Sequence, residues 1–164
     1  MSRKIKKKIL FTPGPLTTSD KTKKSMFIDV GSRDIDFIKI NKSIFFRILQ
    51  LGNASNYVCV PIQGSGTFGL EATLSTLLNN KSKILIVSNG FYGNRLRDIC
   101  KRIKKKFMFL KFSENELISK INTEKFLKKN KSITHLAFVH CETSSGILNN
   151  LEEISLLCKK YKIK

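Results

Sequence analysis

The sequence lacks the long apolar segment that a membrane-spanning helix requires. No stretch of its 164 residues approaches the roughly 20 consecutive apolar residues that cross a bilayer. The basic N-terminus runs directly into Phe11–Gly14 (FTPG), without the apolar core and small-residue cleavage site of a secretory signal. We therefore expect a cytoplasmic protein with no membrane partner.

The sequence is also poor in the residues that build metal sites and disulfide frameworks. Its four cysteines are far apart and form no C-x-x-C pair: Cys59, Cys100, Cys141 and Cys158. Only two histidines, His135 and His140, are available to complete a metal site. We expect no bound metal and four buried, reduced thiols, which agrees with a cytoplasmic location.

Acidic residues are scarce, with 12 Asp and Glu against 31 Lys and Arg, which gives a formal net charge of +19. Such an excess favours nucleic acid or an anionic membrane as a partner. However, the charge lies in separate runs beside apolar segments: Arg3–Lys8, Lys101–Lys106, Lys128–Lys131 and Lys159–Lys164. The runs are mostly lysine rather than arginine, although arginine is the residue that binds phosphates and bases through two parallel hydrogen bonds. They are typical of solvated helix and strand ends, so we expect no specific nucleic-acid partner. A non-enzymatic protein that binds polyanions through this charge remains the alternative function for the chain.

Apolar periodicity predicts an α/β fold. Apolar residues at helical spacing predict a helix over Ile35–Leu51 with one buried face. Four β-prone runs then alternate with helical ones. The predicted strands are Tyr57–Ile62, Lys83–Ser88, Phe107–Phe112 and His135–His140; the predicted helices follow Gly66 and cover Asn94–Ile103, Thr123–Lys129 and Leu151–Tyr161. Repeated crossovers of this kind build a largely parallel sheet with helices on both faces, a three-layer α/β/α arrangement.

Unusual residues follow three of the predicted strands. These loops are Gly64–Thr67, Asn89–Arg95 and Cys141–Gly146. Parallel sheets bind ligands beyond the carboxyl ends of their strands. The three loops therefore predict one site at that edge.

The first loop lies in the segment Val60–Leu70 (VPIQGSGTFGL), which has G-x-G-x-x-G spacing between a predicted strand and a predicted helix. Glycines let the backbone approach an anion, and the positive end of the helix dipole favours a phosphate there. A dinucleotide is disfavoured, because no acidic residue ends the next strand. A Walker A loop is excluded, because Gly66 is followed by Thr67 and Phe68 instead of lysine and a hydroxyl residue. A phosphate site is the prediction, and a glycine turn used only for packing is the alternative.

The other two loops indicate a planar ligand. Tyr92 lies between two glycines, where its ring is free to cover a ring of the ligand or to plug the end of the sheet. The segment His140–Gly146 (HCETSSG) offers hydroxyls and the Glu142 carboxylate to a polar ring substituent, or else caps the following helix. Together the three loops predict a phosphorylated aromatic ring as the ligand.

The whole pattern resembles the class V aminotransferases, pyridoxal-phosphate enzymes of fold type I. Five motifs carry the resemblance in family order: Phe11–Leu16 (FTPGPL), Asp29–Asp34 (DVGSRD), Pro61–Thr67 (PIQGSGT), Ser88–Gly93 (SNGFYG) and Val139–Asn149 (VHCETSSGILN). The resemblance implies pyridoxal 5'-phosphate as the cofactor. It implies that Ser65, Gly66 and Thr67 bind the cofactor phosphate, that Tyr92 stacks on the pyridine ring, and that Thr143 hydrogen-bonds near the ring hydroxyl.

Within the family the sequence is most similar to the branch that moves an amino group from 2-aminoethylphosphonate to pyruvate, whose full-length members are expected to be homodimers. Gly14 and Arg33 would then lie near the substrate or the dimer partner. Arg33 is a candidate phosphonate ligand, or else a structural ion pair beside Asp34 and Asp36. A member of the alanine:glyoxylate or serine:pyruvate type remains the alternative within the family.

The resemblance also implies which parts to expect beyond Lys164. Family members carry an aspartate that pairs with the pyridinium nitrogen, and later a Schiff-base lysine, after the region that matches this sequence. We therefore expect an N-terminal portion of such an enzyme, with an arm over residues 1–22 and an incomplete cofactor-binding large domain over residues 23–164. We expect no catalytic residue in this chain and no transaminase activity from the chain alone.

Overall fold

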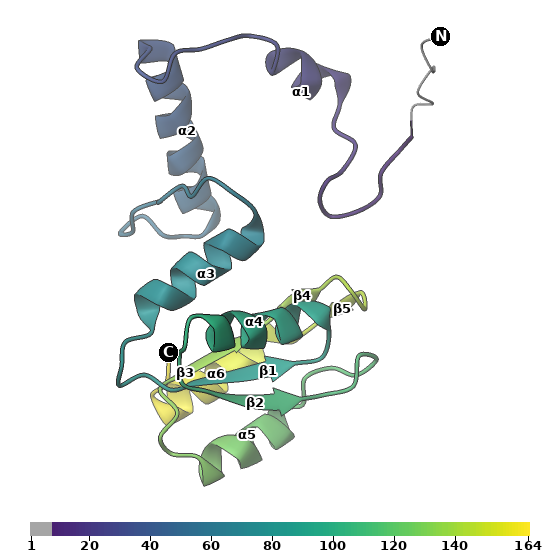
Figure 1. Ribbon diagram of the computed structural model, residues 1–164, viewed down its shortest axis with the longest axis vertical. Coiled ribbons are helices and arrows are strands. Elements are labelled where there is room, and N and C mark those ends of the chain that lie inside the picture. The colour runs from purple at the N-terminus through teal and green to yellow at the C-terminus, as the bar shows by residue number, and fades with distance from the viewer. Residues whose placement is uncertain (1–7) are drawn as a thin grey trace. The chain divides into compact units, whose positions relative to one another are not determined.

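The computed structural model describes residues 8–164, which fall into two compact units (Figure 1). The first unit extends to Pro61 and the second comprises Ile62–Lys164. Most of the basic run Arg3–Lys8 lies outside the described residues. The boundary falls directly before the glycine-rich loop, so all three predicted site loops belong to the second unit. The division into an arm over residues 1–22 and a large domain from residue 23 stays a prediction.

The first unit contains a short helix, α1 (Asp20–Ser25), and a long one, α2 (Ile35–Leu51). The helix α2 has the predicted bounds. The prediction that one of its faces is buried is wrong, because no residue of α2 is buried and Ile38 and Ile44 are 41% and 46% exposed. One long helix and a helix of six residues offer too little apolar surface to enclose a core.

The strand predicted over Tyr57–Ile62 is also wrong. The segment belongs to no sheet: Tyr57 lies in a bend and residues 58–62 have no regular secondary structure, and Tyr57, Val58 and Val60 are exposed. A β-prone sequence becomes a strand only where a neighbouring strand accepts its backbone hydrogen bonds. Within residues 8–164 no strand pairs with this segment.

The second unit is built on a parallel sheet formed by the other three predicted strands. The strands are β1 (Ile84–Ser88), β2 (Phe107–Lys111) and β3 (His135–Phe138), in the order β2-β1-β3. Ile84 of the central strand pairs with Phe107 on one side and with His135 on the other. All five residues of β1 are buried, which is typical of a parallel strand covered on both faces.

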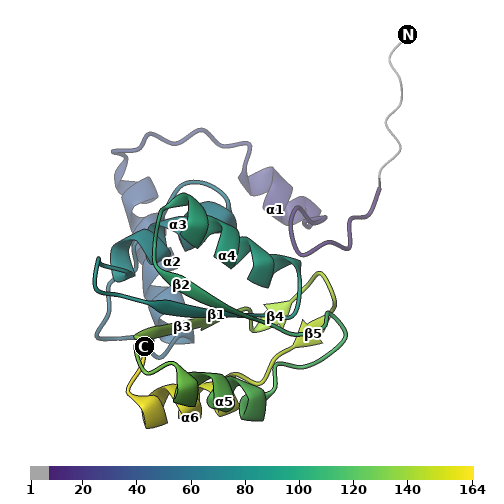
Figure 2. The same ribbon diagram turned by 60° about the horizontal axis from the view of Figure 1, so that its bottom comes forward.

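Helices cover both faces of the sheet (Figure 2). They are α3 (Gly66–Leu77), α4 (Phe91–Arg102), α5 (Lys120–Lys129) and α6 (Leu151–Tyr161). Ile84 and Ile86 point into a core formed with α3 and α4, and Leu85 and Val87 point into a second core formed with α5 and α6. The predicted three-layer α/β/α arrangement is therefore confirmed. None of the helices within residues 8–164 is long and apolar enough to cross a membrane.

A small antiparallel hairpin follows β3. Its strands are β4 (Cys141–Glu142) and β5 (Ile147–Leu148), which pair through Cys141 with Leu148 and Glu142 with Ile147. The predicted strand His135–His140 therefore ends at Phe138. Figure 1 shows the hairpin beside the carboxyl ends of β1 and β2, where the predicted site lies.

Candidate functional site

The glycine-rich loop leads into the first turn of α3. Gly64 has a φ of 141°, a conformation that favours glycine, and Ser65 is the N-cap residue, whose hydroxyl accepts a hydrogen bond from the backbone of Phe68. The backbone N–H groups of Gly66 and Thr67 have no acceptor within residues 8–164. Two donors at the positive end of the helix dipole are therefore available to an anion, as the loop sequence predicts.

Tyr92 lies in the first turn of α4 and not in a loop. The helix begins at Phe91, three residues earlier than predicted, because its first N–H groups find acceptors in the hairpin after β3. Tyr92 is 38% exposed, and its ring meets the Phe91 ring edge to face, with centroids 5.6 Å apart. The helix therefore fixes Tyr92 at the carboxyl edge of the sheet with one part of its ring open.

The Glu142 carboxylate caps α4, so the prediction that it addresses a ligand is wrong. Glu142 is fully buried, and it accepts hydrogen bonds from the backbone N–H groups of Tyr92 (3.3 Å) and Gly93 (3.0 Å) and from the Ser144 hydroxyl (2.6 Å). The Ser144 hydroxyl in turn accepts the Phe91 N–H at 3.0 Å. A carboxylate at a helix N-terminus gains from both the unpaired donors and the helix dipole. The alternative that this segment caps the following helix is wrong as well, because Glu142 and Ser144 cap α4, which lies earlier in the chain, and Asn150 caps α6.

A buried pair of asparagines, which was not predicted, connects the loops at the carboxyl edge of the sheet. Asn89 and Asn149 are each 1% exposed, and each donates its amide N–H to the other's amide oxygen at 2.9 and 3.0 Å. Asn89 also donates to the Glu116 carbonyl, and Asn149 donates to the Val139 carbonyl, both at 2.8 Å. Two asparagines distant in sequence give no signal of such pairing before the fold is known.

Tyr92 and Thr143 line one cavity of about 290 Å³. Its other walls are mainly apolar and come from α3, α4, β3 and the hairpin: Leu70, Leu96, Phe138, Val139 and Cys141. Thr143 is exposed. The predicted ring-stacking residue and the predicted ring-hydroxyl ligand therefore face the same space, although they are 51 positions apart in the sequence.

Thr67 is connected to Tyr92 through Arg95, a residue for which no role was predicted. The Arg95 guanidinium donates to the Thr67 hydroxyl at 2.9 Å, and it lies 5.0 Å from the centre of the Phe91 ring and 5.8 Å from that of Tyr92. Thr67 and Arg95 border a second hollow of about 390 Å³. Residues three positions apart are neighbours on the surface of a helix, so the spacing of Tyr92 and Arg95 was the sequence signal that their side chains lie close together.

The groups around the start of α3 are suited to an anionic phosphate. They comprise two backbone N–H groups, the Ser65 and Thr67 hydroxyls and the Arg95 guanidinium. The hydroxyl of Thr67 accepts from Arg95, so its own proton stays available to a ligand oxygen. Asp98, which also borders the hollow, is paired with Arg97 at 2.8 Å. No atom lies within 4 Å of the position of a side chain at Gly66, so the approach to the helix end is open.

The two candidate substrate residues lie in the first unit. Gly14 lies in the segment before α1, and Arg33 lies directly before α2 with its side chain exposed. Within residues 8–164 Arg33 forms no ion pair: Asp34 accepts the Gly31 N–H at 2.7 Å, and Asp36 faces Lys39 at 3.5 Å. The structural ion pair that the sequence allowed is therefore absent from this part of the chain.

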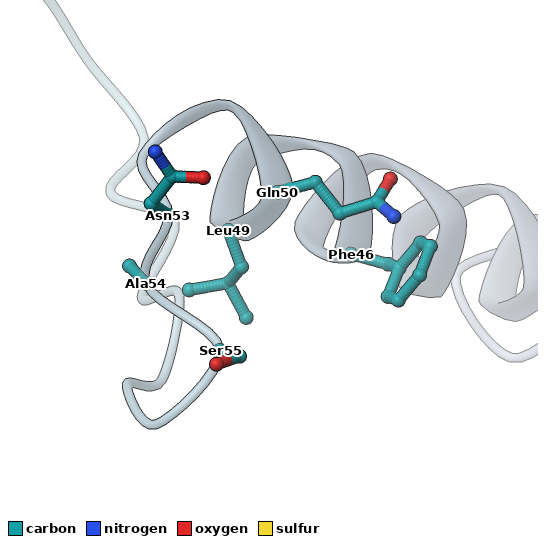
Figure 3. A pocket seen from close by; sticks show the side chains of 6 residues that line it. All are labelled: Phe46, Leu49, Gln50, Asn53, Ala54 and Ser55. Carbon is teal, nitrogen blue, oxygen red and sulfur yellow. The ribbon is translucent and has the colours of Figure 1, made fainter.

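The first unit also has a hollow at the C-terminal end of α2 (Figure 3). Phe46, Leu49 and Gln50 extend from the helix, and Asn53, Ala54 and Ser55 line the hollow from the following turn. No charged side chain lines it. It offers no group that could fix an ionic ligand.

The four cysteines are free, but only Cys100 is buried as predicted. Cys59 and Cys158 are half-buried, and Cys141 is exposed on the hairpin, which contradicts the prediction of four buried thiols. Burial raises the pKa of the Cys100 and Cys158 thiols, which keeps both protonated at neutral pH. Residues 8–164 contain no cluster of three or more potential metal ligands.

Comparison with known proteins gives a consistent result. The family described as Aminotransferase class-V matches residues 27–164. The chain is 42% identical over 162 residues to the 2-aminoethylphosphonate–pyruvate transaminase of Pseudomonas aeruginosa, a match that covers 98% of this chain and 44% of the relative. It is 43% identical to the enzyme of that name from Pseudomonas putida, covering 93% of this chain and 42% of the relative. The chain thus spans less than half the length of these curated relatives.

Solved structures show the same fold. The alanine–glyoxylate aminotransferase of Nostoc superposes with a TM-score of 0.88 at 25% identity, over 99% of this chain and 43% of the other. The pyridoxamine–pyruvate aminotransferase of Mesorhizobium loti superposes with a TM-score of 0.84 at 22% identity, over 94% of this chain and 40% of the other.

Proposed function

The chain belongs to the class-V aminotransferase family, and on that premise we propose that it supplies the cofactor-phosphate side of a transaminase that uses 2-aminoethylphosphonate and pyruvate. The convergence of Thr67, Tyr92 and Thr143 at one edge of the sheet carries the proposal. The choice of substrates is supported by 42% identity to relatives with that name, against 25% to the alanine–glyoxylate aminotransferase. The alanine:glyoxylate type remains the second candidate.

Pyridoxal 5'-phosphate is the cofactor of this family, and when bound it withdraws electrons from the substrate carbon that gains or loses the amino group. In this chain the N–H groups of Gly66 and Thr67 and the hydroxyls of Ser65 and Thr67 would hold its phosphate. The open side of the Tyr92 ring would fix the plane of the pyridine ring, and Thr143 would bind the polar edge of that ring. These residues bind and orient the cofactor. None of them transfers a proton in our proposal.

Substrate binding and assembly are further parts of the proposal. Arg33 is the candidate ligand of the phosphonate group, because a guanidinium binds such a group with two parallel hydrogen bonds and Arg33 has no carboxylate partner within residues 8–164. The Gly14 backbone would lie beside the substrate. A homodimer is the assembly that we expect of the whole enzyme, and a cytoplasmic location stays a prediction.

The proposal is tested by complementation. The chain would be co-expressed with the segment of the Pseudomonas aeruginosa relative that follows the matched region, and alanine formation from pyruvate and 2-aminoethylphosphonate would be titrated with cofactor. We expect activity only when both parts are present. Activity with glyoxylate and alanine, and none with 2-aminoethylphosphonate, would overturn the choice of substrates.

A pair of threonine variants tests the site itself. Thr67→Ala should remove a hydrogen bond to an anionic group, which costs roughly 1.5–3 kcal/mol and raises the cofactor concentration for half-maximal activity by about one to two decades. Thr76→Ala is the matched control, because Thr76 lies in the same helix and its hydroxyl donates only to the Ala72 carbonyl. An equal cofactor requirement in the two variants would show that the glycine-rich loop only turns the chain.

A further inference from the structure

Basic residues gather at the edge of the sheet opposite to the candidate site. In a parallel sheet, strands begin and the covering helices end at the same edge, and Figure 1 shows the C-terminus there, beside the start of the strands. Four segments form this edge in the second unit: residues 81–83, 101–106, 128–131 and 159–164. They contain fourteen of the 31 Lys and Arg residues of the chain and none of its 12 Asp and Glu residues.

Backbone hydrogen bonds set part of this charge in a row. The Lys106 carbonyl accepts from Ile84 at 3.1 Å, and the Lys83 carbonyl accepts from Thr134 at 2.9 Å. Lys164 donates to the Thr134 carbonyl at 3.1 Å, which places it alongside β3. Since neighbouring strands lie about 4.8 Å apart, Lys106 and Lys83 lie side by side at the starts of β2 and β1. Thr134, at the start of β3, separates Lys83 from Lys164.

Helix dipoles explain only some of these charges. Lysine and arginine in the last turn stabilise a helix, and α4, α5 and α6 each end with two of them. Lys105, which precedes β2, also donates to the Ser75 and Leu78 carbonyls at the end of α3. Within residues 8–164, the side chains of Lys83 and Lys106 donate to no helix carbonyl. Ion pairs neutralise few of the fourteen, because within residues 8–164 only Glu71 and Glu124 pair with any of them. Such crowding of like charge destabilises the fold unless an anion neutralises it.

We propose that this edge binds the phosphodiester backbone of nucleic acid without sequence preference, independently of the candidate site at the opposite edge. A row of lysines neutralises a chain of phosphates and releases its counterions. A membrane surface fits less well, because a peripheral helix needs exposed apolar side chains to insert. The apolar and aromatic residues of the four segments, Ile103, Tyr161 and Ile163, are all half-buried.

The test compares two variants of the full chain that carry equal charge. The edge variant replaces four exposed lysines that form no ion pair within residues 8–164, one from each of three helix ends and one from a strand start, by glutamine: Lys101, Lys131, Lys159 and Lys106. The control variant replaces four exposed lysines elsewhere by glutamine: Lys24, Lys42, Lys111 and Lys125. Binding of a labelled single-stranded RNA and of a DNA duplex would be followed by fluorescence anisotropy over a series of KCl concentrations.

We expect the edge variant to bind both probes at least about tenfold more weakly at 0.1 M salt, and the slope of log K against log salt on the RNA to fall by about 3. The control variant should stay within about threefold of the unchanged chain. Equal losses in both variants would show that only net charge matters, and no loss in either would exclude the edge. Stronger binding to vesicles containing phosphatidylserine than to either nucleic acid would also overturn the proposal. Circular dichroism checks that both variants are folded.

Discussion

The Glu142 carboxylate accepts a hydrogen bond from the Gly93 backbone N–H at 3.0 Å, although the two residues are 49 positions apart. This bond joins the hairpin after β3 to the first turn of α4. Tyr92 and Thr143 are the chain neighbours of these two residues. The buried Glu142 side chain therefore helps to set the distance between the proposed ring-stacking residue and the proposed ring-hydroxyl ligand.

Glu142→Gln should destabilise the second unit by about 2–3 kcal/mol. The amide keeps the shape, but it loses the charge that interacts with the helix N-terminus and turns an NH₂ group toward backbone donors. Urea unfolding followed by circular dichroism gives the free energy of unfolding. Glu114→Gln is the control, since Glu114 is exposed and without a partner within residues 8–164. A loss at position 142 no larger than that at position 114 would contradict the capping role.

Gly93→Ala and Gly69→Ala should have opposite effects on stability. A methyl group at Gly93 would collide with the Ser88 side chain and lie 2.9 Å from the Ser88 Cα. This Cα cannot move away, because Ser88 belongs to the buried strand β1. We expect a loss of about 1–3 kcal/mol. Gly69 lies inside α3 with open space around it, so alanine should add about 0.5–1 kcal/mol through helix propensity. Thermal unfolding of the two variants measures both changes in stability. A higher melting temperature for Gly93→Ala would show that the contact between Gly93 and Ser88 can relax.

Asn149→Asp should be among the most damaging single changes. It replaces the amide N–H groups that donate to Val139 and Asn89 by a carboxylate oxygen, and so places a buried charge against two acceptors. The expected loss is about 3 kcal/mol or more. Asn80→Asp, at an exposed residue, makes the same chemical change and should cost less than about 0.5 kcal/mol. Similar denaturation midpoints for the two variants would refute the role of the asparagine pair.

Arg95→Gln should weaken cofactor binding in the complemented enzyme. The change removes the donor to the Thr67 hydroxyl and the positive charge over the Tyr92 ring. We expect about a tenfold rise in the cofactor concentration needed for half-maximal activity. Lys101→Gln tests for a general effect of lost charge on the same helix, because Lys101 is exposed and borders neither hollow. If both variants need the same amount of cofactor, Arg95 does not position Thr67.

The stability of the second unit should fall as the pH is lowered through the range in which His135 titrates. Partial burial, and then the nearby positive charge of Lys164, lower the pKa of His135 from its usual value of 6.5. The unfolded chain therefore takes up this proton more readily than the folded chain. The resulting stability is present above pH 6.5 and is lost as the pH falls toward the lowered pKa. Urea midpoints between pH 7.5 and 5 should decline less steeply for His135→Asn, and identical slopes would exclude His135 as the source.

The elements predicted with correct bounds are those whose signals are local. Both α2 and α6 show helical periodicity and begin after a polar N-cap residue, Asp34 and Asn150. The strand predicted over Tyr57–Ile62 does not form, although its residues are as β-prone as those of β1. What differs is the presence of a neighbouring strand, and a local pattern does not encode that.

The same distinction applies to the site. Strand ends and glycine spacing predicted which loops would meet, and Thr67, Tyr92 and Thr143 do lie at that edge. The early start of α4, the inward turn of Glu142 and the asparagine pair could not be predicted, because each depends on hydrogen bonds between residues 49 to 60 positions apart. The assignment of these residues to cofactor binding stays a proposal.

The packing around Gly90 has a consequence for how the sequence can diverge. Its backbone is extended, with a φ of 179°, so its conformation would suit any residue. Space forbids the exchange, since an added Cβ would lie 2.5 Å from the Glu142 carboxyl carbon and 2.8 Å from the Ser144 hydroxyl. A larger residue at position 90 is thus tolerated only if position 142 shrinks, and then α4 loses its cap. Positions 90, 142 and 144 should therefore change together among descendants of this gene, and substitutions at them should be strongly non-additive.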